Sequence, residues 1–101
     1  MGWATGYIEK LKEGETVSFR PRGNSMSGKI ESGQLCTVDP ITDDTEIKKG
    51  DIVLCKVKKS QYLHLVKAVD GNRYQIGNNK GRINGWIGLS SVYGKLIKVE
   101  D

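Results

Sequence analysis

The spacing of apolar residues changes once along this chain, from a helical period to a period of two. Trp3, Tyr7 and Leu11 recur every four residues and predict a short helix over about 3–13, which Gly14 ends. Beyond it, alternating apolar residues between turn residues predict strands. The expected strands are 16–20, 35–38, 52–57, 62–69, 73–76 and 92–99. This pattern predicts a mostly-β fold, a curled sheet or partly open barrel with one short N-terminal helix.

Turn residues separate several of these strands. Residues 70–72 (Asp-Gly-Asn) predict a hairpin, residues 49–51 (Lys-Gly-Asp) a turn into the next strand, and Asn84-Gly85 another turn. The chain has 101 residues, which is enough for one modest core. We therefore expect a single domain over residues 1–101.

Composition excludes several classes of function. No apolar run is long enough to span a membrane, and the N-terminus has no signal-peptide core. Cys36 and Cys55 lie in apolar runs and are expected to be buried and reduced, which predicts a cytoplasmic protein. One histidine and two separated cysteines are too few for a metal site, and we expect no cofactor. The net charge of +4 comes from scattered basic residues, so nucleic-acid binding is not favoured.

Residues 19–30 carry the most informative motif. Gly23 to Lys29 matches most of a phosphate-binding loop, but Ile30 follows where a serine or threonine hydroxyl is needed. The alternative interpretation is a nucleophile turn, Gly23-x-Ser25-Met26, in which glycine allows a tight turn and leaves space beside the hydroxyl. A serine hydroxyl needs a neighbouring base to accept its proton. His64 and a lysine are the available bases, and a lone histidine in a strand is also compatible with a structural role.

In their order along the chain, these motifs resemble the signal-peptidase and LexA-like serine peptidase superfamily, and the closing stretch, residues 76–86 and 92–94, resembles short phage-type members. The resemblance covers the chain from about residue 19 to its end. It rests on Ser25-Met26, on the Gly50-Asp51 turn into an apolar strand, and on His64 followed by apolar residues and a hairpin. It implies a single peptidase-like β domain with the LexA and signal-peptidase fold.

The resemblance also implies roles for individual residues. His64 occupies the position of the family's base, which is lysine in some branches and histidine in others, and Lys67 is the second candidate. The turn formed by Gly23, Asn24, Ser25 and Met26 is expected to supply the oxyanion site. The family's Gly-Asp-Asn motif reads Gly77-Asn78-Asn79 here. The candidates for the residue that orients the base are Asn78, Asp39 and Asp70.

The leading hypothesis is a soluble serine endopeptidase with a Ser-His or Ser-Lys dyad. It would act on a peptide or protein substrate bound as an extended strand, without a membrane. The alternative is a catalytically inactive module of the same fold that binds a protein partner. The two hypotheses differ in whether the Ser25 hydroxyl must meet a base.

Overall fold

The computed structural model describes residues 2–101 and contains seven strands in one antiparallel sheet. Helix α1 (Thr5–Lys12) precedes the sheet, and a 3-10 turn, η1 (Leu89–Ser91), lies between its last two strands. The strands are β1 (Val17–Phe19), β2 (Leu35–Pro40), β3 (Ile52–Val57), β4 (Ser60–Asp70), β5 (Arg73–Gly77), β6 (Ile83–Gly88) and β7 (Val92–Glu100).

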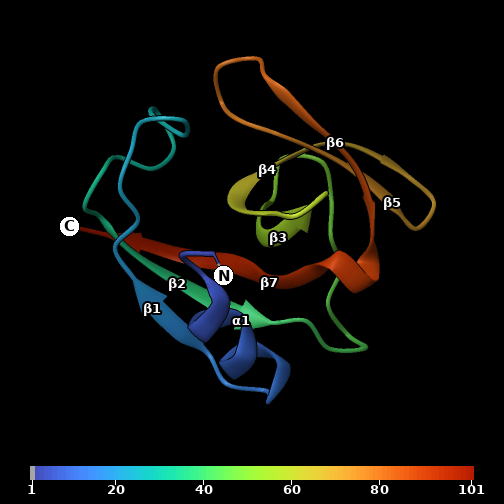
Figure 1. Ribbon diagram of the computed structural model, residues 1–101, viewed down its shortest axis with the longest axis horizontal. Coiled ribbons are helices and arrows are strands. Elements are labelled where there is room, and N and C mark those ends of the chain that lie inside the picture. The colour runs from blue at the N-terminus through green and yellow to red at the C-terminus, as the bar shows by residue number, and fades with distance from the viewer. Residues whose placement is uncertain (1) are drawn as a thin grey trace.

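The last strand holds the two halves of the sheet together. The strand order is β1-β2-β7-β3-β4-β5-β6, so β7 pairs with β2 on one side and with β3 on the other. Figure 1 shows β7 running between α1 with β1 and β2 on one side and the β3 to β6 hairpins on the other. β6 curls back over β3, since a Cβ at Gly85 would come within 3.1 Å of Val57 Cγ1. The sheet is curled but not closed, which confirms the predicted mostly-β fold.

The predicted helix is present and slightly shorter than expected. Ile8 and Leu11 are buried on one face of α1, and Gly14 follows with a φ of 88°, a conformation that favours glycine. Leu11 packs over β7 at Gly94, where an added Cβ would come within 3.0 Å of its Cδ1 atom. Helix α1 therefore covers the sheet near the point where its two halves join.

Two hydrophobic clusters fill the interior, and alternate residues of β3 contribute to both. Leu54 belongs to the cluster beneath α1, β1 and β2, together with Val38. Val53 and Cys55 point the other way, into the cluster formed with β4, β5 and β6, which includes Ile76. This alternation follows from the period of two in a strand, and it makes β3 the shared wall of both clusters.

The expected turn at Asn84-Gly85 was wrong, because both residues lie within β6. Gly85 pairs with Ile76, and the register shifts immediately afterwards, between Ile76 and Gly77. The φ of Gly85 is 148°, so glycine here allows an irregular strand rather than a chain reversal. The actual connection between β5 and β6 precedes it, where Asn78 N donates to Arg82 O at 2.9 Å.

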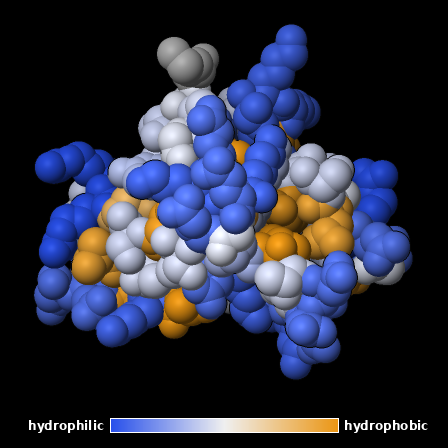
Figure 2. All heavy atoms as spheres, turned by 90° about the horizontal axis from the view of Figure 1, so that it is seen from below, coloured by the Kyte–Doolittle hydropathy of each residue, from blue (hydrophilic) through white to orange (hydrophobic). Residues whose placement is uncertain are grey.

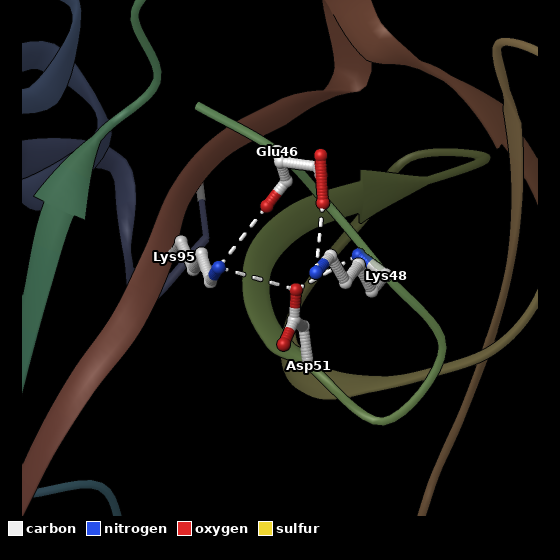
Figure 3. Close-up of polar contacts among 4 residues, drawn as sticks. All are labelled: Glu46, Lys48, Asp51 and Lys95. Atoms are coloured by element: carbon white, nitrogen blue, oxygen red, sulfur yellow. Dashed lines mark hydrogen bonds and ion pairs between the residues drawn. The ribbon is translucent and has the colours of Figure 1, made fainter. Parts of the chain in front are cut away.

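The long loop between β2 and β3 is fastened to β7 by charged groups (Figure 3). Lys95 Nζ donates to the Glu46 backbone oxygen at 3.0 Å and lies 3.3 Å from Asp51 Oδ2. Lys48 Nζ lies 2.8 Å from Glu46 Oε1, and its backbone N–H donates to Asp51. These contacts are exposed or half-buried, so each contributes little to stability, but together they hold the loop in one place.

Polar side chains cover most of the face shown in Figure 2, and apolar atoms appear there as separate patches. Both cysteines are buried and unpaired, as predicted, and burial raises the pKa of the Cys55 thiol to about 12. Within residues 2–101, no helix is long and apolar enough to cross a bilayer.

Candidate active site

The loop that follows β1 holds Ser25 in a fixed place. Arg20 donates from its guanidinium to Gly33 O at 2.8 Å, and Gly33 N donates to Pro21 O at 2.9 Å, which closes the base of the loop. Met26 and Ile30 are buried and anchor the loop in the core. Ser25 is therefore presented by a packed turn rather than by a free loop.

His64 reaches Ser25 from β4, the long strand between β3 and β5. The Ser25 Oγ and His64 Nε2 atoms are 3.2 Å apart, although the two residues are 39 positions apart in the sequence. His64 is only 7% exposed, and the Tyr62 ring stacks against its imidazole with centroids 4.7 Å apart. The side-chain distance is short enough for a hydrogen bond, as a Ser-His dyad requires.

The other ring nitrogen of His64 contacts an amide. His64 Nδ1 lies 2.7 Å from Asn84 Oδ1. An amide oxygen only accepts hydrogen bonds, so the proton of the neutral ring resides on Nδ1 and donates to Asn84. Nε2 then carries the lone pair and can accept the Ser25 hydroxyl proton. In this tautomer the ring has the arrangement of a general base.

The environment of the ring keeps it neutral. Burial lowers the pKa of His64 below its ordinary value, because the charged imidazolium would lose hydration. The hydrogen bond to Asn84 acts in the opposite direction, and the positive charge of Arg82 lowers the pKa further. The free base is therefore the dominant form of His64 at neutral pH.

Asn84 was not among the residues expected to orient the base. Asn78 lines the same cleft, but its Oδ1 atom accepts backbone N–H groups from Lys80 and Arg82 and so shapes the β5–β6 connection. The sequence signal at Asn84 was obscured because Asn-Gly is typical of turns.

The two aspartates that were considered lie elsewhere. Asp39 accepts a hydrogen bond from the Thr16 hydroxyl at 2.7 Å, and Asp70 stands opposite Arg73 at the β4–β5 hairpin. Neither contacts the His64 ring among the described residues. The second nitrogen of the His64 ring therefore contacts the Asn84 amide and not the carboxylate of either aspartate.

Lys67, the second candidate base, lies on β4 at a shift in register between Val66 and Ala68. Its side chain runs over Gly77, where an added Cβ would come within 3.0 Å of Lys67 Cε. Lys67 is absent from the residues that line the cleft around Ser25 and His64. The structure therefore brings His64, but not Lys67, into hydrogen-bond contact with Ser25.

The β5–β6 connection also clamps the serine turn. Asn79 N donates to Ser25 O at 3.0 Å, and Asn79 Nδ2 donates to Ser27 O at 2.8 Å. Two backbone carbonyls of the turn are thereby hydrogen-bonded to a single residue of this connection. Gly23 N, at the start of the turn, donates to Ser32 Oγ at 3.2 Å, whereas no acceptor within residues 2–101 takes a hydrogen bond from the backbone N–H of Ser25 or Met26.

A cleft of about 680 Å³ contains the Ser25–His64 pair. Its aromatic wall is formed by side chains from the N-terminal segment, α1 and β1: Trp3, Tyr7 and Phe19. Asn78, Arg82 and Asn84 line it from the β5–β6 side. Within residues 2–101, no group of three or more histidine, cysteine or acidic side chains is arranged to hold a metal ion. The Ser25 hydroxyl and the His64 imidazole share this cleft with charged side chains, among them Arg82 and Glu31.

A curled antiparallel sheet with a serine turn facing a strand-borne histidine is the architecture expected from the motifs. A family model described as Peptidase S24-like matches residues 5–81. This match includes Ser25 and His64 and spans well over half of the chain, so the protein belongs to the Peptidase S24-like family. A search among curated proteins found no significant match.

Proposed function

We propose that this protein is a serine endopeptidase in which Ser25 is the nucleophile and His64 the general base. The observation that carries the proposal is the chain of contacts Ser25 Oγ to His64 Nε2, 3.2 Å, and His64 Nδ1 to Asn84 Oδ1, 2.7 Å. Burial alone would demand partners for both nitrogens, and what supports catalysis is their identity, a hydroxyl at Nε2 and a proton acceptor at Nδ1, which is the pairing a Ser-His dyad uses. Membership of the peptidase family supports the same chemistry.

The proposed reaction begins with attack of Ser25 Oγ on a peptide carbonyl while His64 Nε2 accepts the hydroxyl proton. The tetrahedral intermediate places its oxyanion near the N–H groups of Ser25 and Met26. His64 then returns the proton to the departing amine, which breaks the C–N bond and leaves an acyl-serine. A water molecule hydrolyses the ester with His64 again acting as base, and Ser25 is regenerated.

Substrate is proposed to bind as an extended strand. Among residues 2–101, β1 pairs only with β2, so its other edge carries unpaired backbone groups. Phe19, at the end of β1, lines the cleft that contains Ser25. An extended peptide added along this edge would run toward the serine turn. The buried free thiols support a reducing compartment such as the cytoplasm as the place of action.

Labelling with a fluorophosphonate, followed by intact mass, tests the proposed pair. Native protein should gain one label, and Ser25→Ala should gain none. His64→Ala should label at least about 100-fold more slowly, since it lacks the base. Asn84→Ala should be slowed by about tenfold or more, because the ring loses its tautomer control. Ser27→Ala is the matched control, since this hydroxyl donates to Asn24 O on the same turn, and it should label like the native protein.

Two results would count against the proposal. Absence of labelling in the native protein would favour a catalytically inactive module that binds a protein partner in the same cleft. Loss of labelling in Lys67→Ala, with normal labelling in His64→Ala, would transfer the role of base to Lys67.

A further inference from the structure

The cleft beside Ser25 has one unusually apolar wall. The Tyr7 and Phe19 rings stack with centroids 4.5 Å apart, and Trp3 lies 5.5 Å from Phe19. Buried Met26, Ile30 and Leu63 extend this apolar lining below the rings. The cleft volume of about 680 Å³ leaves room for a large side chain next to the catalytic pair. A small residue such as alanine would leave most of that aromatic surface exposed to water.

Trp3 is half exposed, yet hydrogen bonds hold it in place. Its indole Nε1 donates to Gln61 O at 3.1 Å. The Gln61 side chain is buried, accepts from Ala4 N at 2.7 Å and donates to Thr5 Oγ1 at 3.0 Å. The start of α1 is thus tied to β4 by the indole and by the two residues that follow it. A large apolar ring with 50% of its surface exposed and its orientation fixed is preorganised for contact with a ligand.

The charged groups of the cleft are mainly positive. Arg20, Arg22 and Arg82 line it, against a single carboxylate, Glu31. Arg20 is engaged with Gly33 O, and Glu31 accepts a hydrogen bond from Gly28 N at 2.7 Å. In the part of the chain that the structure describes, neither Arg22 nor Arg82 forms an ion pair. Their guanidinium groups are free to meet a carboxylate of a bound peptide.

We infer that this cleft selects an extended peptide that carries a bulky apolar side chain, seated against Trp3, Tyr7 and Phe19. A nearby acidic side chain on the same peptide meets Arg22 or Arg82. The inference specifies the substrate class and rests on the proposed peptidase function for its catalytic consequence. Binding itself does not need the Ser25 hydroxyl, so selectivity and catalysis can be tested separately.

The test measures peptide binding to Ser25→Ala protein by titration calorimetry. The probes are blocked alanine-glycine peptides with one phenylalanine and one aspartate, made with the aspartate on either side of the phenylalanine. The tighter of these two peptides is compared with a version in which phenylalanine becomes alanine and with one in which aspartate becomes lysine. Each replacement should weaken binding by about tenfold or more, because a matched pocket discriminates side chains on this scale.

Substitutions of cleft residues then identify which side chains of the protein recognise the phenylalanine and the aspartate of the peptide. Adding Trp3→Ala should abolish the preference for phenylalanine over alanine. Adding Arg22→Glu and Arg82→Glu together should abolish the preference for aspartate over lysine, and its persistence in that folded protein would overturn the acidic part of the inference. Trp86→Ala and Arg73→Glu are matched controls, since both residues are exposed outside the cleft, and both preferences should persist. Circular dichroism checks that Trp3→Ala remains folded.

Equal binding of the phenylalanine and alanine peptides to Ser25→Ala would overturn the inference without any cleft variant. Retention of the phenylalanine preference in a folded Trp3→Ala protein would also overturn it. Selective binding without fluorophosphonate labelling of the native protein would leave this inference standing and remove the proposed catalysis instead. Labelling of the native protein without selective peptide binding would leave the proposed catalysis standing and would overturn this inference.

Discussion

At the scale of single residues, the chemistry of the site depends on the two nitrogens of His64. Asn84 accepts the Nδ1 proton, so Nε2 faces Ser25 as an acceptor. A neutral amide orients the ring but stabilises the imidazolium less than a carboxylate would. Burial and the charge of Arg82 lower the pKa of His64, and the hydrogen bond to Asn84 opposes them only in part. The ring is thus available as a base down to mildly acidic pH.

The pH dependence of labelling follows from that lowered pKa. Fluorophosphonate labelling should fall as pH drops, with a midpoint below the ordinary pKa of histidine, about 6.5. Arg82→Ala removes a positive charge near the ring and should move this midpoint to higher pH, whereas Arg73→Ala should leave it unchanged. A pH series of labelling rates for the three proteins measures this. An Arg82→Ala midpoint that is unchanged or shifted downward would contradict the electrostatic argument.

The lowered pKa of His64 also makes the free energy of unfolding decrease as the pH falls. Because the folded-state pKa is lowered, the unfolded chain binds the proton first as pH falls. The contribution of neutral His64 to the free energy of unfolding is therefore fully present above the unfolded-state pKa. It is lost as the pH falls below that value toward the folded-state pKa.

At the scale of elements, β7 joins the two halves of the sheet beneath α1. Gly94 on β7 pairs with Leu54 of β3 and lies beneath Leu11 of α1. An added Cβ there would come 2.9 Å from Asp39 O and closer still to Val38 Cγ1. Such contacts cannot be accommodated without moving α1 or β2 away from β7. The absence of a side chain is what lets three elements meet at this point.

Gly94→Ala should accordingly lower the free energy of unfolding by about 1–3 kcal/mol, the usual cost of overpacking a core. Gly88→Ala is the control, since Gly88 has an extended φ of −90° and open space around its Cα. It should change stability by less than about 0.5 kcal/mol. Urea unfolding followed by circular dichroism compares them. Equal stabilities of the two variants would contradict the packing described at β7.

At the scale of the whole molecule, the two hydrophobic clusters are not independent units. Leu54 is fully buried in one cluster, and its neighbours Val53 and Cys55 are fully buried in the other. Unfolding of β3 would therefore remove buried residues from both hydrophobic clusters at once. The contact between Ser25 and His64 depends on both halves of the molecule staying together, because Ser25 follows β1 and His64 lies on β4.

The molecule should therefore unfold in one cooperative step. Trp3 reports the α1 side and Trp86 the β6 side, so Trp86→Phe and Trp3→Phe proteins isolate each signal. Their urea transitions by fluorescence should each coincide with the circular dichroism transition of the same protein. Leu54→Ala, added to either, should lower the free energy of unfolding by about 2–5 kcal/mol and move both signals together. Separate transitions for the two tryptophans would show that the clusters unfold independently.

Much of the fold could be predicted because it depends on local pattern. The apolar period of two predicted six of the seven strands, and the Asp-Gly-Asn segment predicted the β4–β5 hairpin. The strand that was missed, β6, begins with residues whose local preference is for a turn. Its pairing with β5 and the irregular backbone at Gly85 override that preference.

The sequence by itself determined the alternation of strands and turns and the burial of the cysteines, which follow from side-chain chemistry and short-range spacing. Its resemblance to a peptidase superfamily singled out Ser25 with His64 or Lys67 as its candidate base. Only the tertiary structure decided that His64, rather than Lys67, contacts Ser25 and that Asn84 contacts the other side of the ring. The physical reason is that strand register and the curl of the sheet set which distant side chains meet. Neither is encoded in the spacing of residues along a single strand.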